Sequence, residues 1–177
     1  NKYFSTSMKI CKTLILFLFC SSLFAQTKNI EFTKDNFKDR KSELKDAVSN
    51  MEEGDKYYKE ATALLKEAVK GNYDSYKNAT GFLINALEYY KKANNFNPDN
   101  ALLNYKIGVC FIFSNFKSNA THFLEKSFTL NPAVDPMIHY YLGRTYHLGL
   151  QWEKAISEYK TYIQGLNIKE NKEQIAD

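Results

Sequence analysis

The sequence is poor in the residues that build disulfide scaffolds and catalytic thiol sites. It has only three cysteines in 177 residues, and two of them, Cys11 and Cys20, lie close to the N-terminus. Cys110 is the one that remains in the rest of the chain, where Val109 and Phe111 flank it. A single cysteine excludes a disulfide framework within one chain, and apolar neighbours indicate a small buried side chain.

Clustered charge and catalytic motifs are also scarce. The 24 basic and 20 acidic residues are interspersed, and three of the lysines precede residue 26, so the remaining chain is nearly neutral. Nucleic-acid and anionic-membrane binders present clustered positive charge, which this pattern lacks. The seven glycines form no phosphate-binding loop or nucleophile elbow, and the three histidines lack the spacing of metal ligands. We therefore expect no enzyme activity, no cofactor, no metal and no nucleic-acid partner.

No apolar run reaches the length of about 20 residues that spans a membrane, but a shorter run stands near the N-terminus. Two lysines precede apolar residues 14–19, and small residues follow up to Ala25. This order predicts a secretory signal peptide over residues 1–25, in which the residues before Met8 are an upstream extension. We expect cleavage after Ala25, export to the periplasm, and a flexible mature N-terminus over residues 26–41.

The rest of the chain contains an internal repeat. Gly108 and Gly143 lie 35 residues apart, and each is followed 12 residues later by an alanine. Such a period predicts stacked helical hairpins. The first copy contains Asn104, Ile107, Gly108, Phe111, Ala120, Leu124, Ser127 and Pro132, and the second contains His139, Leu142, Gly143, Tyr146, Ala155, Tyr159 and Tyr162. An upstream copy of the second helix contains Ala86, Tyr90, Ala93 and Pro98.

The small residues of the repeat predict close contact between paired helices. A glycine inside a helix costs about 1 kcal/mol relative to alanine, so its recurrence needs a compensating reason. We expect Gly108 and Gly143 in first helices to pack against Ala120 and Ala155 in second helices. Asn-Pro pairs after Phe96 and Leu130 are expected to end the second helices, and Asp99 or Asn100 to cap the next helix.

The first unit carries an insertion of some 20 residues between Gly54 and Ala86, relative to the other copies. Large and small residues alternate in steps of three and four through it, which predicts one long helix from Ser42 to about Lys70. Turn-forming residues 71–75 would end it. The apolar stripe of this helix favours packing within the chain over a dimer seam, although the seam remains an alternative.

At these positions the chain resembles the tetratricopeptide repeat family. The resemblance implies an all-α, TPR-type helical-hairpin solenoid of about three repeats with a long first helix, over residues 42–166. A turn around Gly165 and Asn167 is then expected, and residues 167–177 would start a truncated capping helix, which suggests that a longer protein continues beyond them.

The same resemblance places a partner-binding groove on the concave face, which the first helices line. A second interpretation, equally open, is that several of these side chains only pack against the neighbouring second helix. The implied partner-binding residues are Leu102, Tyr105, Val109, Ile112, Met137, Tyr140, Arg144 and His147.

The stretches around Gly108 and Gly143 also resemble the N-terminal repeat region of exported OmpA-like envelope proteins with propeller segments, some of which belong to type IX secretion and gliding machinery. This implies a non-enzymatic scaffold that binds protein partners at the outer membrane, in a secretion or peptidoglycan-associated complex. Peptidoglycan would be reached only through domains absent from this chain. Two other functions stay open: self-association through the long first helix, and a periplasmic enzyme subunit, for which no polar cluster is found.

Overall fold

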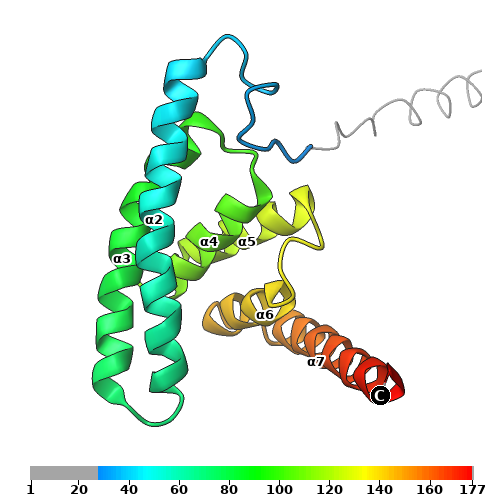
Figure 1. Cartoon of the computed structure of the whole chain (residues 1–177). Helices are drawn as coiled ribbons and strands as arrows, with labels where there is room; N and C mark the ends of the chain where they lie inside the picture. The colour runs from blue at the N-terminus through cyan, green and yellow to red at the C-terminus, as the bar shows by residue number, and fades with distance from the viewer. Residues whose placement is uncertain (1–27, 177) are drawn as a thin grey trace, which may run out of the picture.

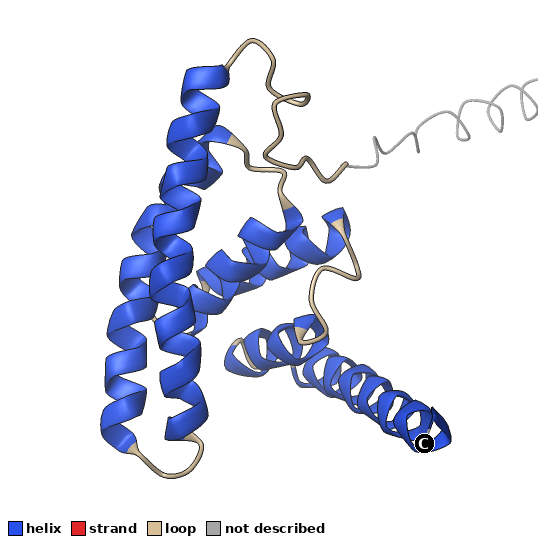
Figure 2. Cartoon of the chain, in the orientation of Figure 1, coloured by secondary structure: helices blue, strands red, loops and turns tan. Residues whose placement is uncertain are grey.

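The computed structural model describes residues 28–176, and side chains as far as residue 166. The expected signal peptide over residues 1–25 lies outside the described residues. Within them the chain is entirely helical and contains no strand (Figure 2). None of these helices is both long and apolar enough to cross a membrane. The helices are α2 (Lys41–Ala68), α3 (Tyr73–Phe96), α4 (Ala101–Ile112), α5 (Asn119–Leu130), α6 (Ile138–Leu148) and α7 (Trp152–Ala176).

Each first helix packs against the helix that follows it, which gives three successive antiparallel pairs (Figure 1). The pair α2/α3 is the longest and stands beside α4/α5, and α6/α7 follows at the far end. Neighbouring pairs meet where α4 lies on α3 and where α6 lies on α5 and α4. The predicted all-α fold is therefore confirmed.

In all three pairs, the glycine of the first helix lies close to a large side chain of the second helix. A β-carbon added to Gly108 would lie 2.5 Å from Cγ of Leu124 and 3.3 Å from the carbonyl oxygen of Ala120, so the expected close approach is confirmed. The same atom on Gly143 would meet the ring of Tyr159 at 2.7 Å. Each pair therefore brings its glycine against one large side chain of the second helix, rather than against the alanine alone.

Gly54 completes the pattern, since a β-carbon there would lie 2.5 Å from the ring of Tyr90. Tyr90 occupies the place in α3 that Leu124 has in α5. The long hairpin is thus built on the same contact, and its insertion lies beyond it. The insertion lengthens both α2 and α3, whereas the sequence suggested a longer first helix.

The helix ends lie close to the predicted positions. Phe96 and Leu130 end α3 and α5 before Asn-Pro pairs, because proline disfavours a helical residue in front of it. Asn100 caps α4, and its side chain accepts a hydrogen bond from the N–H of Leu103 at 2.9 Å. Asn72 caps α3 in the same manner, accepting from Ser75 at 3.1 Å.

The apolar stripe of α2 faces α3. Leu44, Ala47 and Ala61 are buried, and Met51 and Leu65 pack against the same core. Because α3 covers this stripe, it serves packing within the chain. The alternative of a dimer seam along α2 is therefore wrong for this stripe.

Residues 28–40 are held in place, in contrast to the expected flexible N-terminus. The N–H of Ile30 donates to the carbonyl oxygen of Asp99 at 2.8 Å. In return, the Ile30 carbonyl oxygen accepts from the side-chain amides of Asn97 at 2.8 Å and Asn100 at 3.0 Å. The segment therefore seals the turn between α3 and α4.

Aromatic contacts hold the same segment against the end of α3. The ring centroids of Phe37 and Phe96 lie 4.6 Å apart, and Phe32 stacks on Phe96 at 6.3 Å. The Arg40 guanidinium lies 4.2 Å from the centroid of the same Phe96 ring. Repeat offsets do not extend into residues 28–40, so no pattern in the sequence predicts this contact.

The predicted turn around Gly165 and Asn167 is wrong, because α7 continues through both positions to Ala176. A β-carbon on Gly165 would meet nothing within 4 Å. This glycine therefore marks neither a close approach nor a turn, and the helix tolerates it at the usual cost of about 1 kcal/mol.

Candidate functional site

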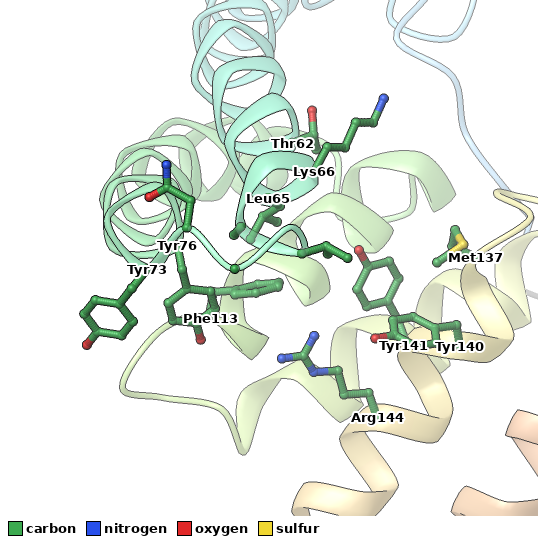
Figure 3. A pocket seen from close by; sticks show the side chains of 14 residues that line it. Thr62, Leu65, Lys66, Tyr73, Tyr76, Phe113, Met137, Tyr140, Tyr141 and Arg144 are labelled. Atoms are coloured by element: carbon green, nitrogen blue, oxygen red, sulfur yellow. The ribbon is translucent and has the colours of Figure 1, made fainter.

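A hollow lies between the far end of the α2/α3 hairpin and α6, where Phe113 follows α4 (Figure 3). It is an open groove of about 790 Å³. We call it the tip groove. Its lining residues are Thr62, Leu65, Lys66, Ala68, Val69, Gly71, Asn72, Tyr73, Tyr76, Phe113, Met137, Tyr140, Tyr141 and Arg144.

Aromatic side chains dominate the tip groove. Five of its 14 lining residues are Tyr or Phe, and they come from α3, the end of α4, and α6. Two of the apolar side chains are largely exposed, since Val69 is 89% and Tyr73 is 76% accessible. Exposed aromatic groups of this kind are typical of surfaces that bind other proteins.

The charge of the tip groove is of one sign. Lys66 and Arg144 line it, and no acidic residue does. The Arg144 guanidinium lies 4.8 Å from the centroid of the Phe113 ring. None of the described acidic side chains forms an ion pair with Arg144. The Phe113 ring therefore holds the guanidinium in one place, and its N–H donors are of the kind that bind carboxylates.

Contacts between α4 and the start of α6 hold Met137 and Tyr141, which line the tip groove. The hydroxyl of Tyr105 donates to Asp135 at 2.9 Å, and the same carboxylate accepts from the N–H of Met137 at 2.8 Å. The rings of Tyr105 and Tyr141 meet edge to face at 5.9 Å. Burial raises the pKa of Tyr141 to about 12, and it raises that of Tyr105 further. Both phenols therefore stay neutral near pH 7.

A second polar cluster joins the first two hairpins. One oxygen of Asp55 accepts from both Nζ of Lys106 and the hydroxyl of Tyr90, each at 2.6 Å. The Lys106 side chain is only 16% exposed, so this ion pair is partly shielded from water. Burial raises the pKa of Tyr90, which keeps that hydroxyl protonated as a donor. The cluster fixes α4 against α2 and α3, and thereby the place of Phe113.

Some of the predicted partner-binding residues line the tip groove, and the others do not. Met137, Tyr140 and Arg144 line the tip groove. Leu102 and His147 are exposed but lie outside its lining.

Tyr105, Val109 and Ile112 are buried, so the expectation that they line an open concave surface needs correction. They fill the space between hairpins, as the second interpretation of these side chains held.

The sequence missed the other wall of the tip groove. Leu65, Val69, Tyr73 and Tyr76 belong to the insertion, where no repeat offset assigns a facing direction. The signal that could have found them is the pair Tyr73 and Tyr76, which lies within and directly after the turn-forming residues 71–75.

Among the described residues, the other reactive side chains form no second site. Cys110 is fully buried, and burial raises the pKa of its thiol, so it is an inert packing group. His139 pairs with Glu158 at 2.7 Å. Among the described residues, no group of three His, Cys, Asp or Glu side chains is arranged to hold a metal ion.

Two comparisons with known proteins bear on the family of this chain. No protein-family model matches the chain, and no curated protein matches it. The function is therefore argued from the geometry and from the repeat pattern.

Proposed function

We propose that this chain is a tetratricopeptide-type solenoid of about three repeats and acts as a protein-interaction scaffold without catalytic activity. Three observations support this. The hairpins follow one another in order, the Gly-to-large-side-chain contact recurs in each, and the second helices share their alanine and tyrosine or leucine positions. The tip groove is then the binding surface, because it combines exposed aromatic groups with two cations.

The tip groove favours one chemistry of partner segment. Its aromatic lining suits apolar side chains, and Arg144 and Lys66 suit a carboxylate beside them. We therefore infer that a partner protein inserts a short segment in which apolar residues adjoin an acidic residue. Groove volumes between about 300 and 1,000 Å³ hold ligands of a few side chains.

We place this scaffold in the bacterial cell envelope. The leader pattern of residues 1–25 and the resemblance to exported OmpA-like envelope proteins support a periplasmic, outer-membrane-associated role. A secretion complex of the type IX kind, or a peptidoglycan-associated complex, is the assembly that this resemblance favours. Binding to peptidoglycan itself is assigned to other domains.

Photo-crosslinking in the expressing cell tests this function. A photoreactive amino acid at Tyr73 should give a discrete adduct with one partner, and Arg144→Glu should abolish it, because the groove then loses a cation and gains a like charge. The matched control carries the same amino acid at Asn78, which is exposed on α3 outside the groove. Equal adducts from both positions, or none from Tyr73, would contradict the proposal.

The alternative function, self-association through the long first helix, has lost the surface on which it depended. The α2 stripe packs against α3. Self-association would therefore need another exposed apolar face.

A further inference from the structure

The two walls of the tip groove belong to different hairpins and are joined through α4. This helix packs against α3 on one side and against α6 on the other, whereas no extensive contact among the described residues joins α2 or α3 to α6 directly. Phe113, which follows α4, lies between the walls. Its ring meets that of Tyr76 at 6.2 Å, and the Arg144 guanidinium lies 4.8 Å from its centroid. The width of the tip groove therefore depends on how α4 is held on each side.

On the α6 side, the link is a buried tyrosine. Tyr105 of α4 is only 4% exposed, and its hydroxyl donates to the carboxylate of Asp135 just before α6. The same carboxylate accepts from the N–H of Met137, which lines the tip groove. This wall is therefore held to α4 by a shielded hydrogen bond.

On the side of the first hairpin, the link is an ion pair. Nζ of Lys106 in α4 lies 2.6 Å from a carboxylate oxygen of Asp55 in α2, 51 positions away. The same Nζ lies 6.0 Å from the ring centroid of Tyr58 and 5.8 Å from that of Tyr90, within the range of a cation–π interaction. Lys106 is therefore held by three side chains of the first hairpin.

This ion pair differs from most others among the described residues. Four of the seven join residues three apart on the chain, and their basic side chains are 46% to 70% exposed. Lys106 is only 16% exposed. Exposed pairs contribute little to stability, whereas separation of a shielded pair leaves a charge without its partner. The ion pair therefore resists a change in the tilt of the first hairpin on α4.

The repeat itself does not require charges at this junction. Counted from the repeat glycines, the positions equivalent to Asp55 and Lys106 at the next junction of hairpins are Val109 and Tyr141. Val109 is 1% exposed and belongs to the apolar core against which Tyr141 packs. Apolar and aromatic packing is therefore sufficient to stack one hairpin on the next, and the ion pair is a departure confined to the junction that carries the lengthened hairpin.

The length of the first hairpin makes its tilt important for the tip groove. Val69, in the wall of the groove, follows Asp55 by 14 residues, which is about 21 Å along a helix at 1.5 Å per residue. A tilt of about 5° at the ion pair therefore moves the tip by about 2 Å. Dispersion attraction falls steeply over such a distance, so a ligand would lose contact with one wall.

From these observations we propose that Asp55 and Lys106 are positioning residues of the tip groove. Their ion pair fixes the tilt of the α2/α3 hairpin on α4 and thereby the width of the groove. Neither residue lines the groove, so both act through the helices rather than by contact with the partner. The effect on partner binding rests on the proposed function of the groove, whereas the control of its width does not.

Pulsed electron–electron double resonance on the protein expressed from its full sequence measures the width. Nitroxides attached to p-acetylphenylalanine at the exposed positions Lys70 and Leu148, one beside each wall, report the distance without a cysteine. Lys106→Met should shift the mean distance by about 2 Å or more and broaden its distribution. Lys106→Arg keeps the cation and should preserve the distance. Asp55→Asn removes the same ion pair without a change in size and should act like Lys106→Met.

Lys91→Met is the matched control for the loss of a lysine, because the ion pair of Lys91 with Glu88 lies within α3. Circular dichroism verifies that the helices persist in each variant, and Asp55→Asn decides the test if Lys106→Met does not fold. A distance unaffected by removal of the ion pair, or an equal shift in Lys91→Met, would overturn the proposal.

Photo-crosslinking from Tyr73 tests the consequence for binding. The adduct should decrease on the order of tenfold in Lys106→Met and persist in Lys106→Arg and Lys91→Met. An unchanged adduct despite a shifted distance would overturn the positioning role. Absence of the adduct from the unmodified protein would instead contradict the proposed function, and the distance measurement decides the control of groove width in either case.

Discussion

At the scale of single residues, the decisive feature is the glycine in each first helix. Gly108 is placed against Leu124, a fully buried side chain that has little room to move. The repeated glycine could be recognised from the sequence because close packing leaves a missing side chain at a fixed offset. The identity of the side chain that fills the space could not, since it is Tyr90 in one pair and Leu124 in another.

Two glycines of the chain offer a matched comparison. Gly108→Ala should lower the free energy of unfolding by about 1 to 3 kcal/mol, because the new β-carbon overpacks against Leu124. Gly81→Ala should raise it by about 0.5 to 1 kcal/mol, since this helical glycine is exposed and meets nothing within 4 Å. Urea unfolding followed by circular dichroism measures both. Equal effects of the two changes would refute the close contact of α4 and α5.

Gly108→Leu tests the close contact of α4 and α5 more severely. The larger side chain should destabilise by at least the same 1 to 3 kcal/mol, because it must displace Leu124 and approach the Ala120 backbone. An unchanged melting temperature would argue against the hairpin.

The half-buried phenol of Tyr141 should make stability fall at high pH. Burial raises its pKa from 10.0 to about 12, so the unfolded chain releases this proton at lower pH than the folded protein does. Above pH 10 the unfolded state binds fewer protons, and the free energy of unfolding therefore decreases as the pH rises towards 12. Tyr141→Phe should make this decrease shallower while changing little at pH 7. Denaturant titrations at several pH values measure the slope, and an identical slope in the variant would count against the burial of this ring.

At the scale of elements, the sequence predicted regular features well and irregular ones poorly. The ends of α3 and α5 at Asn-Pro pairs follow from local backbone restrictions, so they could be read directly. The insertion could be counted, but its division between α2 and α3 depends on where the turn at residues 69–72 forms. The predicted turn at Gly165 failed because a glycine in an exposed helix costs little when the rest of the helix is stable.

Residues 28–40 show the same limit for a segment without regular structure. Their hydrogen bonds run to groups some 70 positions away, such as Asn100, and no periodic pattern signals such a contact. We regard this segment as part of the folded domain, because it satisfies polar groups of the α3 to α4 turn that would otherwise be buried without partners.

Asn97→Ala should release this segment. The amide of Asn97 is almost fully buried and donates to Ile30, so its loss leaves the Ile30 carbonyl with fewer partners and should cost about 1 to 3 kcal/mol. Limited proteolysis should then cut within residues 28–40 at a higher rate. Asn95→Ala, at an exposed position two residues away, is the control and should leave the digestion pattern unaltered. Resistance of the Asn97 variant equal to that of the control would show that the segment is held by other means.

At the scale of the whole molecule, the insertion changes what a row of hairpins can do. The lengthened α2/α3 hairpin brings Val69, Tyr73 and Tyr76 opposite α6, although α4/α5 separates the two pairs in the chain (Figure 3). The tip groove is therefore a product of three hairpins together.

The measurement that tests this account most directly is crosslinking from both walls of the tip groove. Photoreactive residues at Tyr73 on α3 and at Tyr140 on α6 belong to different hairpins and line the same space. The account predicts that both positions capture the same partner, at the same segment of its sequence, and that Arg144→Glu removes both adducts. Capture of different partners by the two positions, or adducts that persist in the Arg144 variant, would contradict it.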